Sequence, residues 1–78
     1  MITKELRLII TFDTTADAMA METACGERGF CGRLIPVPTV VSAGCGLAWC
    51  ADVSMQETMQ KLIDEQGLKI HEMLLCVI

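Results

Sequence analysis

Aromatic residues are scarce in this chain, and tyrosine is absent. Only Phe12, Phe30 and Trp49 are aromatic among its 78 residues. Large rings therefore cannot fill the interior, and we expect a core built from Leu, Ile, Val, Ala and Met. The six methionines predict a pliable core, because the unbranched Met side chain fills irregular gaps without fixing them.

Positive charge is also sparse, and it is not clustered. The net charge is −4, and the six basic residues are scattered along the chain. Neutralising nucleic-acid phosphates requires a basic patch, so the sequence argues against nucleic-acid binding. The basic residues are Lys4, Arg7, Arg28, Arg33, Lys61 and Lys69.

The chain lacks a long hydrophobic run and a recognisable leader. The apolar run near the N-terminus is interrupted by Arg7, is too short to span a bilayer, and has no signal-peptide cleavage pattern. We therefore expect no membrane association and a cytoplasmic location. A length of 78 residues is enough for one domain, which we expect to occupy residues 1–78.

The cysteines do not form a recognisable framework. Their number, five, is odd, which argues against a complete set of disulfides and fits a reducing compartment. Cys25 and Cys31 form a Cys-x5-Cys pair, and Cys45 and Cys50 form a Cys-x4-Cys pair. Neither spacing matches the Cys-x2-Cys pairs typical of zinc sites, so we expect no metal and no cofactor. Cys25, Cys31 and Cys76 are most simply interpreted as core residues.

The first half of the chain predicts a strand followed by a helix. Apolar residues alternate from Leu6 to Phe12, and Ile9 adds bulk on the other face. Thr14 with Asp17 resembles a capping box, so a helix should follow to about Arg28, with Gly29 closing it. The expected apolar face of this helix is Ala16, Met19, Ala20, Thr23 and Ala24.

The second half predicts two strands, a helix and a final strand. Residues 33–38 form a strand that must lie at an edge, because Pro36 and Pro38 lack N–H groups on the same side. A third strand covers 47–52. Ser54-Met55-Gln56-Glu57 reads as a capping box that opens a second helix, with Gly67 at its end. The expected apolar stripe of that helix is Met55, Met59, Leu62 and Ile63, and residues 68–78 form the last strand.

The order β-α-β-β-α-β is the ferredoxin-like pattern. It predicts an α+β sandwich in which two helices cover one face of a four-stranded antiparallel sheet. Right-handed crossovers place the first strand inside the sheet and the second at an edge, where the prolines also require it. The last strand is the other edge and is very apolar from 73 to 78, so we expect a homodimer through this edge or through the sheet face.

Cys45 is the candidate for chemistry, because Gly44 and Gly46 flank it. Glycines leave the sulfur uncrowded and let backbone N–H groups form an anion-binding nest. The topology places this loop at the same end as the turn Asp13-Thr14-Thr15, which opens the first helix. The positive end of that helix favours a thiolate. The alternative is a flexible loop with a passenger cysteine, in which case residues 13–15 serve only as helix caps.

Three further residues each allow two interpretations. Cys50 is either a resolving thiol for Cys45 or a small buried apolar residue. His71 is either a charge partner for Cys45 or an ordinary strand histidine. Trp49 either packs under the loop or marks a docking surface.

Three segments carry a family resemblance. They are Thr11-Phe12-Asp13-Thr14-Thr15-Ala16, Gly32-Arg33-Leu34-Ile35-Pro36-Val37-Pro38 and Ser42-Ala43-Gly44-Cys45-Gly46-Leu47-Ala48. Together they resemble the selenium/sulfur (Se/S) carrier protein-like family over almost the whole chain. The resemblance implies a carrier, not an enzyme, that holds a persulfide or perselenide on Cys45. Relatives often have a basic residue at the position of Cys50, where this chain has a second thiol.

The same resemblance implies the partners. A cysteine desulfurase or selenocysteine lyase would donate the sulfur or selenium, and an acceptor protein would take it. The alternative function is a non-catalytic ferredoxin-like regulatory or interaction module, because this fold supports many unrelated functions. The two functions differ in whether Cys45 is reactive and exposed.

Overall fold

The computed structural model describes residues 5–37 and 46–77. No helix within these ranges is long and apolar enough to cross a membrane. The elements are β1 (Leu6–Thr11), α1 (Thr15–Arg28), β2 (Arg33–Pro36), β3 (Leu47–Ala51), a short 3-10 helix (Val53–Met55), α2 (Gln56–Gln66) and β4 (Glu72–Val77).

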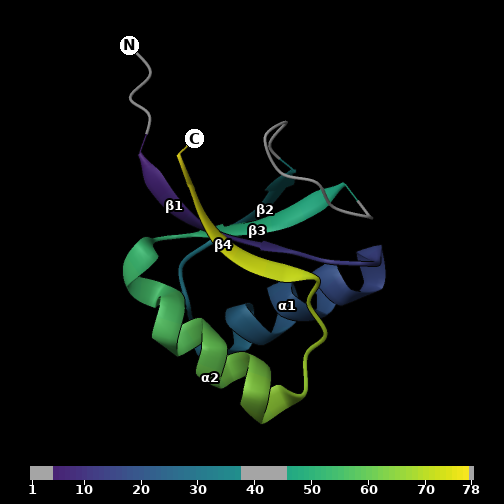
Figure 1. The fold of residues 1–78 in the computed structure, drawn as a ribbon. Coiled ribbons are helices and arrows are strands. Elements are labelled where there is room, and N and C mark those ends of the chain that lie inside the picture. Colours follow the sequence, from purple (N-terminus) through teal and green to yellow (C-terminus); the bar gives the residue numbers. More distant parts are fainter. Residues whose placement is uncertain (1–4, 38–45, 78) are drawn as a thin grey trace.

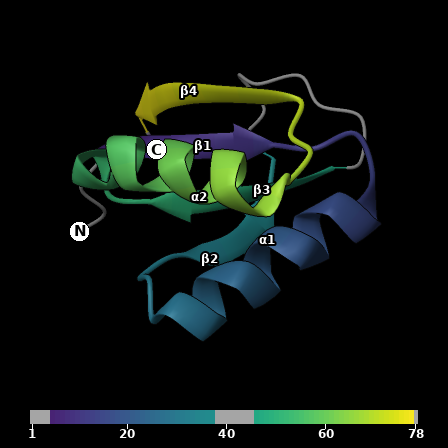
Figure 2. The same cartoon turned by 90° about the horizontal axis from the view of Figure 1, so that it is seen from below.

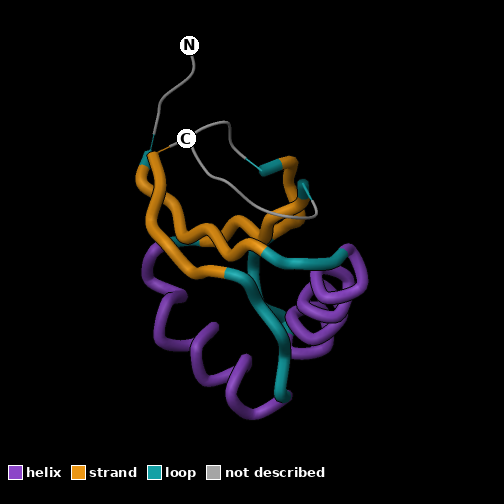
Figure 3. The backbone as a smooth tube through the Cα atoms, turned by 45° about the vertical axis from the view of Figure 1, so that its right-hand side comes forward, coloured by secondary structure: helices purple, strands orange, loops and turns teal. Residues whose placement is uncertain are grey.

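The strands form one antiparallel sheet in the order β2-β3-β1-β4. Both helices lie on the same face of this sheet, below it in Figure 1 and in front of it in Figure 2. The tube in Figure 3 separates the helical layer from the strand layer. The predicted ferredoxin-like architecture is confirmed, and so are the positions of β1 inside the sheet and of β2 and β4 at its edges.

The predicted alternation of the first strand is confirmed from Leu8 to Phe12, whereas Leu6 at its start is 48% exposed. Leu8, Ile10 and Phe12 belong to the core between the sheet and the helices, whereas Ile9 belongs to a smaller cluster on the opposite face of the sheet. All four side chains are fully buried. Burial of a large aliphatic or aromatic side chain stabilises the fold by roughly 1.5–3 kcal/mol, so β1 is the main apolar contributor of the sheet.

Helix α1 begins and ends where the sequence predicts, but it is rotated about its axis. Thr14 caps it by accepting a hydrogen bond from the Asp17 N–H at 3.1 Å, and Gly29 ends it with φ 68°. The predicted apolar face is confirmed only at Ala24 and is otherwise wrong, since Met19 is 56% exposed and Ala16, Ala20 and Thr23 are exposed too. The residues that this helix buries are Ala18, Met21, Ala24 and Cys25.

The rotation of α1 has a simple cause. Small or apolar residues occur on nearly every side of this helix, so the sequence does not define one stripe. The larger side chains of α1 decide which of its sides faces the core. Met21 and Cys25 lie one turn apart and turn together toward α2, where the Cys25 Sγ lies 3.9 Å from the Met59 Sδ.

The predicted cap of the second helix is also wrong. The side chain of Asp52, not Ser54, accepts a backbone hydrogen bond, from the Ser54 N–H at 2.9 Å. This bond caps the 3-10 turn that precedes α2, and Met55 at the N-cap of α2 makes no side-chain cap. Asp and Ser both cap well, and Asp52 stands two positions nearer the end of β3 than Ser54 does. The expected end at Gly67, with φ 63°, is confirmed.

The last strand is shorter than predicted. It begins at Glu72, not at Leu68. The preceding residues pack as a loop, with Leu68 and Ile70 against the main core. Their apolar character reflects this packing and not strand pairing, which is why composition alone extended the strand too far.

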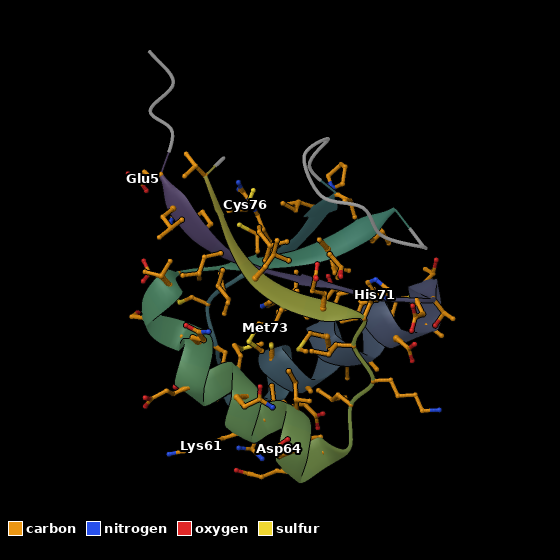
Figure 4. All side chains as sticks on the ribbon, in the orientation of Figure 1. Glu5, Lys61, Asp64, His71, Met73 and Cys76 are labelled. Atoms are coloured by element: carbon orange, nitrogen blue, oxygen red, sulfur yellow. The ribbon has the colours of Figure 1, made fainter. Side chains whose placement is uncertain are left out.

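The face of the sheet away from the helices, which we call the open face, carries its own apolar cluster. Ile9, Ala48, Cys50 and Cys76 are buried there. Figure 4 shows Met73 directed toward the helices and Cys76 directed to the other side of β4. The partly buried side chains that pack against this cluster are Ile35, Val37 and Leu74.

Gly32 is the position where a side chain would do most damage. Its φ is 154°, and a Cβ built there lies 2.7 Å from three atoms of the Trp49 indole. We expect Gly32→Ala to lower the free energy of unfolding by roughly 1–3 kcal/mol, because the alanine both overpacks the indole and strains the backbone. Urea unfolding followed by the fluorescence of Trp49 measures this change.

Gly26 provides the matched control. It lies in α1, and a Cβ there meets no atom within 4 Å. Gly26→Ala should therefore raise stability by about 0.5–1 kcal/mol through helix propensity. Equal unfolding free energies for the two variants would contradict the packing seen around Trp49.

The homodimer remains a prediction, and the structure indicates how to test it. Val77 on the β4 edge is 55% exposed. A lysine on an edge strand blocks pairing with another edge, so Val77→Lys should convert a dimer to a monomer in light scattering. Met19→Lys is the control, because Met19 is equally exposed but lies on α1. A wild-type chain that is monomeric at high micromolar concentration removes the homodimer.

Candidate functional site

Cys45 and Gly44 lie outside the residues that the structure describes. The two ends of the β2–β3 connection are described. The Val37 N–H donates to the carbonyl oxygen of Gly46 at 3.0 Å, which adds one more bond to the β2–β3 pairing. Gly46 is exposed, and its φ of 78° favours glycine at this position.

The β2–β3 connection and the start of α1 lie at the same end of the sheet. Thr11, the last residue of β1, pairs with Ala48 on one side and with Glu72 on the other. Gly46 is two residues before Ala48, and the α1 cap Thr14 is three residues after Thr11. Gly46 therefore lies at the end of the sheet where α1 begins, as predicted for the loop that contains it. The predicted position of Cys45 lies outside the described residues and stays a prediction.

The turn before α1 does more than cap the helix. Thr14 is the cap, as expected, while Thr15 is the first helical residue. The Asp13 carboxylate lies 2.9 Å from the Nδ1 atom of His71, and the His71 N–H donates to the Thr11 carbonyl at 2.7 Å. The contact between Asp13 and His71 was not predicted from the sequence, although each residue was a separate candidate. The signal for it was topological, since both residues stand at the end of the sheet where β1 ends and β4 begins.

The Asp13–His71 pair is exposed, and it links two connections. The side chains are 67% and 47% exposed, respectively. Exposed pairs contribute little stability, typically about 0–1 kcal/mol. Its effect is positional, because it holds the entry to β4 against the turn that opens α1. Figure 4 shows His71 at that corner, beside the start of α1.

Cys50 lies on β3, four residues after Gly46. Its Cα pairs with Ile9 on β1 and with Arg33 on β2, and its side chain is 9% exposed. The extended chain from Leu47 to Cys50 spans roughly 10 Å. The interpretation of Cys50 as a buried residue is confirmed. Its role as a resolving thiol for Cys45 involves a residue outside the described ranges and stays a prediction.

Cys25 is a structural residue. It is fully buried between α1 and α2, with its Sγ 3.7 Å from the Met21 Sδ. Burial raises the pKa of this thiol from 9.0 to about 11. The neutral thiol is the form that the core stabilises. This contribution is therefore complete below pH 9.0 and is lost as the pH rises toward 11.

Cys31 is exposed, so its assignment to the core is wrong. It lies between the end of α1 and the start of β2, where Phe30 and Gly32 make the inward contacts. Phe30 packs against the core, and the backbone of Gly32 lies on the Trp49 indole. Cys76 is buried on the open face, as predicted.

The structure also contains a hollow that the sequence analysis missed. Its volume is about 360 Å³, and two arginines, two cysteines and one aspartate contribute to its wall. These residues come from three separate segments, and only the strand register brings them together. The lining residues are Arg7, Cys31, Gly32, Arg33, Cys50, Ala51 and Asp52.

Arg7, one of the two arginines in this hollow, is paired with carboxylates. Arg7 donates to the Glu5 carboxylate at 2.6 Å and lies 3.9 Å from the Asp52 carboxylate. The Ser54 N–H bond, and to a lesser extent Arg7, lower the pKa of Asp52, which keeps this carboxylate ionised. No group of three or more potential metal ligands occurs within 5–37 or 46–77.

The fold and these sites describe a small α+β domain with several differently exposed thiols. A model of the protein family described as "Putative Se/S carrier protein-like" matches residues 7–75. The chain therefore belongs to this family, and the resemblance is confirmed. No curated protein and no solved structure matches the chain.

Thiol labelling tests these environments directly. In the native protein at pH 8, we expect iodoacetamide to modify Cys31 before Cys50 and Cys76, and Cys25 last, because Cys25 is buried and its pKa is about 11. Peptide mass spectrometry after a short pulse measures the order. Labelling in urea is the control and should abolish it. Native Cys25 reacting as fast as Cys31 would contradict the packing of α1 against α2.

Proposed function

We propose that this protein carries sulfur or selenium as a persulfide or perselenide on Cys45. The observation that carries the proposal is the family match, whose range of residues 7–75 includes Cys45. A carrier thiol must be reached by two different partners in turn. Glycine on both sides of Cys45 supports this access, because the two adjacent residues have no side chain.

The transfer follows the rules of thiol–disulfide exchange. The donor is an enzyme of the cysteine desulfurase or selenocysteine lyase type that bears a persulfide or perselenide. The Cys45 thiolate attacks the terminal atom, a new bond forms to the Cys45 Sγ, and the donor cysteine leaves as a thiolate. An acceptor protein then attacks the same terminal atom, and Cys45 leaves as a thiolate. The domain is unchanged after one cycle, as a carrier requires.

The described surroundings support a role for the helix terminus. Thr14 and Thr15 place the positive end of α1 at the end of the sheet where Gly46 lies. A helix N-terminus stabilises negative charge within its first turn, so this end suits an anionic sulfur. A cytoplasmic location would keep Cys45 reduced between transfers.

The test is loading by a donor enzyme. The reduced protein is mixed with a cysteine desulfurase and cysteine, and non-reducing peptide mass spectrometry then locates the added sulfur atom. We expect the atom on Cys45, and we expect Cys45→Ser to reduce loading to the background of the donor alone. A selenocysteine lyase with selenocysteine provides the same test for selenium.

Cys31→Ser is the matched control, because Cys31 is an exposed thiol elsewhere in the domain. It should load like the wild type. Loading that survives Cys45→Ser and disappears in Cys31→Ser would overturn the assignment of the carrier thiol. Loading at neither residue would overturn the carrier function.

A further inference from the structure

The hollow near Cys31 lies at the end of the sheet opposite the β2–β3 connection. Its wall includes the start of β2, the end of β3 and Arg7 near the start of β1. The connection and the turn before α1 join the other ends of these strands. With a volume of about 360 Å³, it falls in the size range of small-molecule sites. It is therefore a separate place from Cys45 and needs its own explanation.

The register places a guanidinium group on each side of the hollow. Arg33 on β2 pairs with Cys50, and Arg7 on β1 pairs with Cys76. Both cysteines belong to the cluster on the open face, and residues directly opposite in an antiparallel pair share a face. Arg7 and Arg33 thus approach the same face from the two neighbours of β3.

The hollow presents one guanidinium group that the described carboxylates leave unpaired. Two guanidinium groups and one carboxylate stand in its wall, although the net charge of the chain is −4. Arg7 is partly neutralised by Glu5 and Asp52. Arg33 is exposed and has no ion-pair partner among residues 5–37 and 46–77. A guanidinium group binds carboxylates through paired N–H donors, so Arg33 is available to an anionic ligand.

A thiol stands at the same place. Cys31 lines the hollow and is the exposed cysteine of the described part of the chain, while Cys50 lies beside it with only 9% of its surface exposed. The backbone between Cys31 and Arg33 is held by the contact of Gly32 with the Trp49 indole. The exposed Cys31 sulfur and the Arg33 guanidinium group, which has no ion-pair partner within 5–37 and 46–77, thus come from one short segment.

We propose that this hollow binds small anionic disulfides and that Cys31 exchanges with them. Arg33, assisted by Arg7, holds a carboxylate of the reagent. The Cys31 thiolate attacks the nearer sulfur, the Cys31 Sγ–S bond forms, and the disulfide bond of the reagent breaks. The other half leaves as a thiolate and takes up the proton that Cys31 released. The reagent disulfide is the oxidant, and the product is a mixed disulfide on Cys31. This exchange does not depend on the carrier role of Cys45.

The experiment compares two disulfides of different charge. The full-length chain with Cys45→Ser is reacted with 5,5′-dithiobis(2-nitrobenzoate), a dianion, and with neutral 4,4′-dithiodipyridine. Quenched samples are mapped by mass spectrometry to obtain the rate at Cys31 for each reagent. The ratio of the two rates cancels differences in exposure and folding. At low ionic strength we expect this ratio to exceed that of a short cysteine peptide by about tenfold.

Two arginine variants separate a local effect from overall charge. Arg33→Gln should lower the ratio at Cys31 by roughly threefold to tenfold, because it removes the free guanidinium group. Arg28→Gln changes the net charge equally, but Arg28 lies on α1 and pairs with Glu65. It should leave the ratio unchanged. The enhancement should also shrink in concentrated salt, which screens the approach of the anion.

Three results would overturn the proposal. One is a ratio equal to that of the peptide. A second is the same loss of ratio in Arg33→Gln and Arg28→Gln, which would indicate overall charge. The third is modification at Cys50 in place of Cys31. None of these results bears on sulfur loading at Cys45, so the two proposals fail separately.

Discussion

The fold depends on β1 being buried on both of its faces. Ile9 faces one side and Leu8 and Ile10 face the other, and all three are fully buried. A strand of this kind is stable only with a neighbour on each edge and apolar cover on each face. β3 and β4 are the neighbours, and the helices cover one face. On the open face, Ile35, Val37 and Leu74 pack against the cluster that contains Ile9. The sites follow from this arrangement, because the register with β1 decides which residues meet at each end of the sheet.

The registers divide the chemistry between the two ends. At one end Thr11 aligns with Ala48 and Glu72, which gathers the turn before α1, the entry to β4 and the residues that flank the β2–β3 connection. At the other end Arg7 and Arg33 are brought to the two sides of Cys50. A shift of one residue in either pairing would turn Arg7 or Cys50 toward the helices. Neither guanidinium groups nor a polar hollow could be accommodated in that apolar layer.

The sequence predicts the parts of this fold that local chemistry decides. Pro36 places β2 at an edge, Thr14 caps α1, and Gly29 and Gly67 end the two helices. Each of these residues has a backbone property that allows few alternatives. The alternation of β1 predicts the core for the same reason. The confirmed edge position of β2 agrees with the missing N–H group of Pro36, because an interior strand needs its N–H groups on both sides.

The sequence fails where two local solutions are nearly equal. Small or apolar residues of α1 occur on nearly all of its sides. Only the packing of this helix against Met59 therefore selects the face that carries Cys25. Asp52 and Ser54 are both good caps, and the strand end decides between them. Cysteine is a residue type that is usually buried, so the sequence predicts Cys31 in the core. In the structure Gly32 contacts the Trp49 indole instead, and Cys31 is exposed. The hollow could not be predicted at all, because its wall joins three segments that only the registers bring together.

The same packing sorts the described thiols by the chemistry open to them. Cys25, in the apolar layer between the helices, has its pKa raised to about 11 and is held as an inert thiol. Cys76 and Cys50 are buried on the open face, where access limits them. Cys31 alone in this set is exposed, and it stands beside a guanidinium group that has no described partner. Reactivity in such a chain depends on access and local charge rather than on the number of cysteines. The proposed carrier thiol, Cys45, needs the same access, which is the property that the glycines beside it in the sequence favour.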